Sequence, residues 1–180
     1  TLDKGSSKFQ LMNPDMPDLY VAQSGLIAGE GVSAPSHEAV YQVEQQSYEL
    51  ADGKDQLQVS LFWKSDDGVQ VTKRFTFMRG TYLINVEHII SNGSDKDWTG
   101  REYRQLVRTL PQDDDNLGSQ FIYTYTGGAI YTEADKYEKY GFDDMDDKKL
   151  ARDVKGGWIS MLQHYFLSAW VPPADQENHF

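Results

Sequence analysis

The 180-residue sequence contains no cysteine, so it forms no disulfide and has no thiolate to serve as a nucleophile or zinc ligand. It also has no run of about 18 apolar residues, the length that a membrane-spanning helix requires. Basic residues are few, 17 against 28 acidic ones, and the net charge is -11. Because this charge repels phosphate groups, we expect neither nucleic acid nor an anionic lipid surface as a partner.

Sequence motifs for common cofactors and catalytic centres are also missing. The chain contains no G-x-G-x-x-G, P-loop or G-x-S-x-G sequence, and its four histidines include no H-x-x-x-H pair. The acidic runs at residues 113–115 and 143–147 place carboxylates side by side, without the spacing and glycine of a calcium-binding loop. We therefore interpret both runs as solvated surface and expect no metal, nucleotide or covalent cofactor.

Alternation of apolar and polar residues predicts β-strands in the first half of the chain. Aromatic residues make up 13% of the sequence and include 11 tyrosines, which is typical of a β-rich protein. Asp67-Gly68 and Arg79-Gly80 are turn signals between alternating segments. We predict a three-stranded antiparallel meander over residues 56–91, with Leu57, Val59, Leu61 and Trp63 on one face and Phe75 and Phe77 in the core.

Shorter patterns extend this prediction along the chain. Residues 98–110 are typical of a further strand, residues 25–35 of a surface loop, and Gly127-Gly128 of a turn. Residues 133–149 are highly charged and predict a short helix or an irregular segment. Many short strands with turns every 8–12 residues or so indicate an all-β, mainly antiparallel sandwich with little helix. The length of 180 residues suits a single domain with its own core.

The stretch 155–172 has the densest apolar and aromatic content of the chain. It opens with two glycines and ends at Pro172-Pro173. Its spacing fits one face of a helix, but the same residues also fit two short strands joined by a turn near Gln163-His164, and periodicity does not decide between them. In either case we expect the stretch to lie in the core, with both tryptophans largely buried. The residues predicted for the core are Gly156, Gly157, Trp158, Tyr165, Phe166 and Trp170.

Three motifs in this stretch resemble the periplasmic domain of YidC-type membrane protein insertases. They are Gly156-Gly157-Trp158, residues 163–166 and residues 169–172. Segments 21–26, 73–80 and 136–140 match the same family in the same order, so the resemblance covers nearly the whole chain. It implies a large twisted sandwich, or supersandwich, similar to galactose mutarotases. Residues 1–180 are then expected to form a single periplasmic domain, as a fragment of a longer one, without the transmembrane core that follows it in the family.

The family resemblance also implies a function. It predicts a noncatalytic interaction domain, not an enzyme, on the periplasmic face of the Gram-negative inner membrane, with no direct membrane insertion by this fragment. The whole protein would act as an insertase and chaperone for nascent membrane proteins, alone or beside the Sec translocon. In the family, the later part of the domain contacts SecF of the SecD–SecF complex, and residues 122–172 match that part. Tyrosines are enriched at interfaces, and the candidates for this contact are Tyr123, Tyr125, Tyr131, Tyr137 and Tyr140.

Two alternatives of other classes stay open. A cleft of the sandwich could hold a glycan or an extended peptide, with exposed tryptophans as a stacking surface. A mutarotase-like enzyme would need a histidine acid and a carboxylate base in one pocket. The nominated residues are His88 or His164 with Glu87 or Glu102. The lining of the deepest cleft separates these hypotheses, because a carboxylate–histidine pair favours the enzyme and apolar walls favour a peptide.

Overall fold

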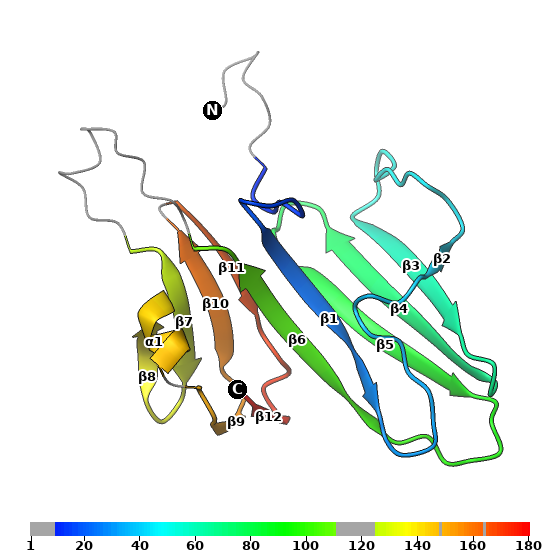
Figure 1. Ribbon diagram of the computed structural model, residues 1–180. Helices are drawn as coiled ribbons and strands as arrows, with labels where there is room; N and C mark the ends of the chain where they lie inside the picture. Colours follow the sequence, from blue (N-terminus) through cyan, green and yellow to red (C-terminus); the bar gives the residue numbers. More distant parts are fainter. Residues whose placement is uncertain (1–9, 111–124, 148, 164) are drawn as a thin grey trace. The chain divides into compact units, whose positions relative to one another are not determined.

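The computed structural model describes residues 10–110, 125–147, 149–163 and 165–180 (Figure 1). About half of the chain is β-strand, in several antiparallel sheets, so the predicted all-β class with minor helix is confirmed and is consistent with a sandwich. In the described ranges no helix is long and apolar enough to span a membrane. Contacts divide the chain into two compact units. The first unit combines the segments Thr1–Gln23 and Arg104–Phe180, and the second unit is the segment Ser24–Tyr103 between them in sequence. That residues 1–180 are a single domain stays a prediction.

Two long strands, β1 (Tyr20–Ala28) and β6 (Gly100–Arg108), pair with each other and pass from one unit into the other. The strand predicted at residues 98–110 is therefore present. The loop predicted at residues 25–35 begins later than expected, because β1 continues to Ala28. This extension keeps Leu26, which is 6% exposed, within the strand and in the core of the second unit.

The second unit contains a four-stranded antiparallel sheet of order β2-β3-β4-β5. Its strands are β2 (Gln42–Val43), β3 (Gln56–Lys64), β4 (Val69–Met78) and β5 (Ile84–Asn92). The predicted meander is thus confirmed. The β3–β4 register is unbroken from Gln56 opposite Met78 to Lys64 opposite Gln70, so alternate residues of β3 keep to one face. That face carries the four predicted apolar residues of β3.

The core of the second unit is centred on Leu26, Val69 and Val71, with Trp63 and Trp98 packed against it. The indole Nε1 of Trp98 donates a hydrogen bond to the Ser33 carbonyl at 3.0 Å, which satisfies the ring's polar atom. The core prediction is wrong for Phe77, which is 37% exposed because it lies at the end of β4 beyond these residues. Phe75 is half-buried.

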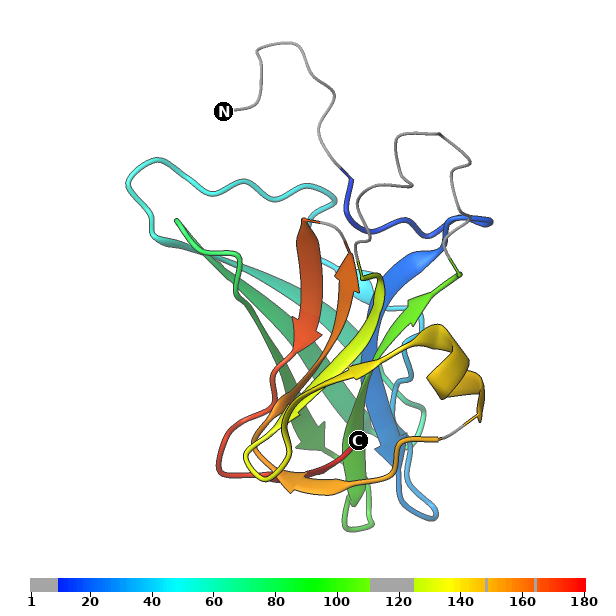
Figure 2. The same cartoon turned by 90° about the vertical axis from the view of Figure 1, so that its left-hand side faces the viewer.

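The first unit contains a second four-stranded antiparallel sheet, of order β11-β10-β7-β8. Figure 2 shows its strands side by side. They are β11 (Phe166–Trp170), β10 (Trp158–Gln163), β7 (Gly127–Thr132) and β8 (Lys136–Tyr140), and the short strands β9 (Asp153–Lys155) and β12 (Glu177–His179) pair separately. Of the two structures left open for the aromatic stretch, the pair of short strands is therefore correct.

Three predictions for this unit need correction. Gly127 and Gly128 open strand β7 instead of forming a turn, and the turn lies at residues 133–135. The charged segment 133–149 contains the expected short helix, α1 (Phe142–Asp147), but also the strand β8, which was not predicted. The core prediction is wrong for Tyr165 and Phe166, which are 83% and 42% exposed. Both lie where the chain reverses between β10 and β11, so their side chains reach the surface.

The other residues predicted for the core of the aromatic stretch are more enclosed. Gly156 is buried, and Gly157, Trp158 and Trp170 are half-buried. The indole Nε1 of Trp170 donates to the backbone carbonyl of Gln105 at 3.0 Å, which ties β11 to β6 within the first unit. Trp170 is thus anchored, and neither tryptophan is fully buried.

Candidate functional site

Three aromatic side chains form a row across strands β8, β7 and β10. Tyr137 lies opposite Tyr131, and Tyr131 lies opposite Trp158 in the strand register. Residues directly opposite each other in an antiparallel sheet point to the same face. The Tyr131 and Trp158 rings are stacked, with centroids 5.8 Å apart and an interplanar angle of 12°. The Tyr137 ring is 6.2 Å from Trp158. We call these three residues the aromatic ladder.

The aromatic ladder has an exposed end and a polar rim. Tyr137 is 47% exposed, whereas the other two rings are half-buried. The Tyr131 hydroxyl donates to Glu133 Oε2 at 3.3 Å, and Lys136 Nζ lies 2.7 Å from Glu133 Oε1. The hydrogen bond from Lys136 is the main reason that the pKa of Glu133 is lowered. Apolar area beside satisfied charged groups is the usual composition of a protein interface.

The remaining predicted tyrosines do not all join this face. The Tyr125 hydroxyl donates to the Gly128 carbonyl at 2.6 Å, and Lys139 Nζ lies 4.6 Å from the Tyr125 ring centroid. Since Lys139 and Tyr137 are two residues apart on β8, Tyr125 adjoins the face of the aromatic ladder. Tyr140 belongs to the opposite face, and Tyr123 lies outside the described residues.

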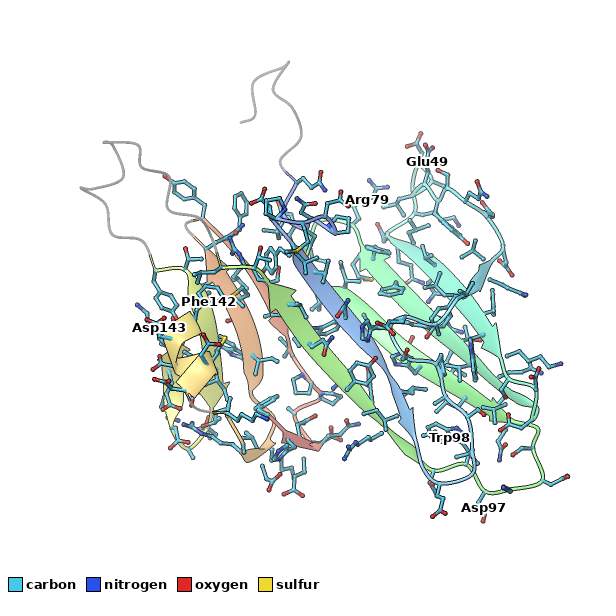
Figure 3. All side chains as sticks on the ribbon, viewed as in Figure 1. Glu49, Arg79, Asp97, Trp98, Phe142 and Asp143 are labelled. Carbon is cyan, nitrogen blue, oxygen red and sulfur yellow. The ribbon has the colours of Figure 1, made fainter. Side chains whose placement is uncertain are left out.

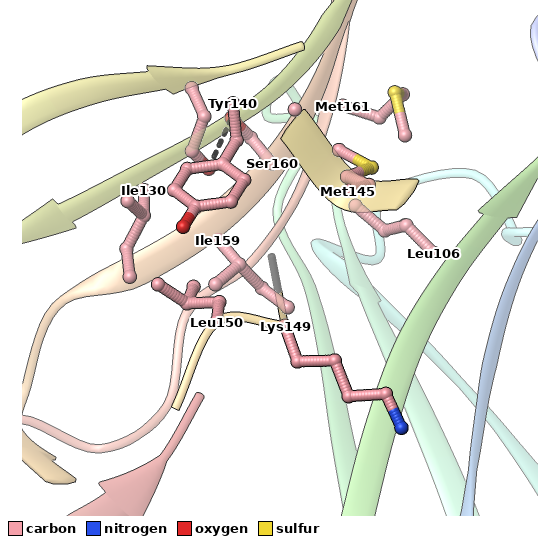
Figure 4. A pocket seen from close by; sticks show the side chains of 11 residues that line it. Leu106, Ile130, Tyr140, Met145, Lys149, Leu150, Ile159, Ser160 and Met161 are labelled. Atoms are coloured by element: carbon pink, nitrogen blue, oxygen red, sulfur yellow. Dashed lines mark hydrogen bonds between the residues drawn. The ribbon is translucent and has the colours of Figure 1, made fainter. Parts of the chain in front are cut away.

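The opposite face of the same sheet contributes to an open pocket of about 220 Å³. Figure 4 shows Tyr140 and Met145 at this pocket, together with aliphatic side chains. No histidine and no carboxylate is among its described lining residues. Its apolar walls are formed by Leu106, Ile130, Met145, Leu150, Ile159 and Met161. Apolar walls of this kind suit a side chain of a bound peptide better than a mutarotase, which needs a histidine and a carboxylate in its pocket.

A histidine–carboxylate pair does occur, but in the interior of the second unit. His88 Nδ1 lies 3.2 Å from Glu102 Oε1, and the His88 side chain is only 3% exposed. Lys73 lies directly opposite His88, donates from Nζ to the Ser24 carbonyl at 2.7 Å, and interacts electrostatically with Glu102. Burial lowers the pKa of Lys73, and the charge of Glu102 opposes that effect. None of these three residues lines the pocket described above, which fits a structural role better than catalysis.

The other nominated catalytic residues are not brought together with this pair by the described residues. Glu87 lies 3.9 Å from Arg74 at the surface of the meander, and His164 falls outside the described residues. In the part of the chain that the structure describes, no three histidine, aspartate or glutamate side chains are grouped to hold a metal ion.

Beside the turn that leads into β8, Arg152 pairs with Glu138 and with Asp135, the latter at 3.3 Å. The hydrogen bond from Arg152 is the main cause of a lowered pKa of Glu138. The stabilisation that this pair supplies is thus present above the ordinary glutamate pKa of 4.5 and is lost as the pH falls through the lowered value.

Substituting Arg152→Met should raise the pKa of Glu138 toward its ordinary value, because the hydrogen bond that favours the charged carboxylate is lost. NMR titration of the Glu138 side-chain carboxyl carbon measures this shift. The matched control is Lys136→Met, which should raise the pKa of Glu133 and leave Glu138 unchanged. An unchanged Glu138 pKa in Arg152→Met would contradict the assignment of this pair.

Comparison with known proteins identifies the family. Residues 1–180 match the family model described as the YidC periplasmic domain. The membrane protein insertase YidC of Thioalkalivibrio sulfidiphilus is 51% identical over 169 residues, which cover 89% of this chain and 29% of that protein. The same protein of Methylococcus capsulatus is 48% identical over 169 residues, covering 92% and 30%.

A third relative, membrane protein insertase YidC of Azotobacter vinelandii, is 44% identical over 171 residues, covering 94% of this chain and 30% of the relative. The chain thus spans about 30% of the length of these relatives. The family model and the identities agree with the motifs at residues 156–158, 163–166 and 169–172. The chain therefore belongs to the YidC periplasmic domain family, whose place is the periplasmic face of the inner membrane.

Proposed function

We propose that this chain is a noncatalytic interaction domain of a membrane protein insertase and chaperone, and that it assists the insertion and folding of nascent membrane proteins with or beside the Sec translocon. The proposed partner is the periplasmic part of SecF in the SecD–SecF complex. The observation that supports this function best is the aromatic ladder, which lies within the segment matched to the SecF-contacting part of the family.

Physical properties of the aromatic ladder suit a reversible protein contact. Tyr137 offers apolar area with a polar tip, and Tyr131 is held in place by Trp158 and Glu133, so little side-chain freedom is lost on binding. A surface of three rings with a charged rim corresponds to a contact of modest area, as expected for transient partners. Because the chain has a net charge of -11, association with a basic surface should slow as salt is added.

An extended peptide in the apolar pocket is the second candidate function. The pocket is open, and its walls are supplied by β6, β7, β10, the helix α1 and the segment that follows it. Such walls favour an apolar side chain of an extended segment over a sugar, which would need convergent polar groups.

Substituting both Tyr131→Ala and Tyr137→Ala in the full-length insertase should weaken its association with SecD–SecF about thirtyfold and so reduce co-purification, since two interface tyrosines at about 1 kcal/mol each cost about 2 kcal/mol. Tyr165→Ala is the matched control, because Tyr165 is 83% exposed in the same stretch of chain but lies outside the aromatic ladder. Circular dichroism must show that both variants are folded. Undiminished co-purification by the folded double variant would exclude the aromatic ladder as the contact.

A further inference from the structure

The turn between β4 and β5 exposes a group of large apolar side chains. Five of the eight residues from Phe77 to Ile84 are of this kind. Their exposed fractions are Phe77 37%, Met78 41%, Tyr82 105%, Leu83 59% and Ile84 46%. We propose that this tip, residues 77–84, contacts the lipid surface of the periplasmic leaflet. This inference uses the family's location and is independent of the proposed SecF contact.

Strand pairing brings two of the five exposed apolar residues of the tip together. Phe77 lies directly opposite Ile84 on β5 and opposite Leu57 on β3, so these three side chains form one row across the sheet. The row lies on the same face of the sheet as Trp63 and Val71, but Phe77 and Ile84 at this end are exposed. Single exposed apolar residues are common, but five within one short turn indicate an interaction surface.

Residue types at the tip fit the boundary between water and lipid. Tyrosine is enriched there because its ring is apolar and its hydroxyl is polar, and leucine and isoleucine prefer the hydrocarbon side. Arg79 Nε donates to the Lys54 carbonyl at 3.0 Å, and its Nη2 donates to the Ala51 carbonyl at 3.3 Å. These two bonds go to neutral oxygens, so the positive charge of Arg79 is available to a lipid phosphate.

The tip is held in a defined conformation. The Arg79 amide donates to the Asp55 carbonyl at 2.7 Å, and the Leu83 amide donates to Thr81 Oγ1 at 3.1 Å. Gly80 has a φ of 77°, which allows the reversal between the strands. The apolar side chains are therefore presented by an ordered hairpin, and little conformational entropy is lost when they meet lipid.

Charge limits which lipids the tip can contact. The chain has a net charge of -11, and Figure 3 labels an acidic residue, Glu49, at the same end of the sheet as Arg79. Anionic lipids should therefore weaken the contact, and zwitterionic headgroups should allow it. The affinity of a few side chains for lipid is small, but a domain attached to a membrane protein meets the bilayer at high effective concentration.

A fluorescent probe on full-length insertase in zwitterionic nanodiscs tests this proposal. This chain has no cysteine, so in a cysteine-free background Tyr82→Cys gives a single labelling site for an environment-sensitive dye. The control is Asp66→Cys, in the exposed β3–β4 turn at the opposite end of the same strands. We expect lipids with a spin label near the headgroup to quench the dye at position 82 at least threefold more than at position 66.

Each outcome of the quenching experiment decides the proposal. Stronger quenching at position 82, reduced when anionic lipid replaces zwitterionic lipid, supports it. Equal quenching at the two positions overturns it. A blue-shifted dye at position 82 that lipid does not quench also overturns it, because protein then covers the tip.

Discussion

Replacing Gly157 by alanine should lower the free energy of unfolding by about 3 kcal/mol, of which about 1–2 kcal/mol is the cost of a left-handed backbone conformation for a non-glycine residue. Gly157 has a φ of 82° directly before β10. A Cβ atom there would also overlap the backbone oxygen of Tyr131 on β7, and backbone within a paired sheet has little room to move. The substitution should therefore disturb the aromatic ladder at its centre.

Urea unfolding followed by circular dichroism measures this loss, and Gly53→Ala is the matched control. Gly53 has a similar φ of 73°, but nothing lies within 4 Å of the position that its Cβ would take. The control variant should lose only about 1 kcal/mol, the cost of the backbone conformation alone. Equal losses in the two variants would show that the close approach of Gly157 to Tyr131 is not a source of strain.

Substituting Glu102→Gln should destabilise the chain by about 2–3 kcal/mol at neutral pH, because it leaves the buried Lys73 ammonium without the opposite charge that offsets its desolvation. Lys73 is 8% exposed and keeps its bond to the Ser24 carbonyl, so the chain cannot easily release it to water. This loss is smaller than the usual cost of breaking a fully buried pair, because the Glu102 side chain is 23% exposed.

The loss caused by Glu102→Gln should become smaller as the pH rises toward the ordinary lysine pKa of 10.5. The pKa of Lys73 is already lowered in the folded state by burial, and loss of Glu102 lowers it further. Between the lowered pKa and 10.5, the unfolded chain binds more protons than the folded one, so stability rises with pH. Unfolding free energies measured from pH 7 to pH 10 test this.

The control for the buried charge cluster is Glu87→Gln. Glu87 is next to His88 in sequence but is 55% exposed and 3.9 Å from Arg74. An exposed pair of this kind should contribute less than about 1 kcal/mol. A loss in Glu102→Gln as small as in Glu87→Gln, or one that grows with pH, would contradict the description of the cluster.

Local signals predicted the meander correctly. Strict alternation on either side of Asp67-Gly68 specified both the strands and the facing residues, because each depends only on neighbours in sequence. The same kind of local signal gave a wrong prediction at Gly127 and Gly128, which open strand β7 instead of forming a turn. A Cβ at Gly128 would overlap the Met145 side chain of α1, and one at Gly127 would lie 2.7 Å from the Tyr125 hydroxyl. Glycine is present there because other side chains pack closely against β7, which sequence alone does not show.

The candidate site was predicted only in part. Composition drew attention to Tyr131 and Tyr137, but Trp158 was assigned to the core instead of to their row. The row depends on the pairing of β10 with β7, two strands separated by about 30 residues in sequence. The register of such a pair cannot be inferred from the local alternation of apolar and polar residues. Lys73 and His88 were missed as a pair for the same reason, since they meet only when β4 pairs with β5.

The position of β8 at the edge of its sheet bears on how copies of this domain behave when they are crowded. An edge strand offers unpaired backbone groups to which another chain can add. Among the described strands, β8 has β7 as its single neighbour, and it carries Lys136 and Lys139 on its two opposite faces. Lysines oppose the addition of an identical strand, since like charges would be brought together. The strand that presents Tyr137 is therefore protected against self-association through its backbone, while its side chains stay accessible to a different partner.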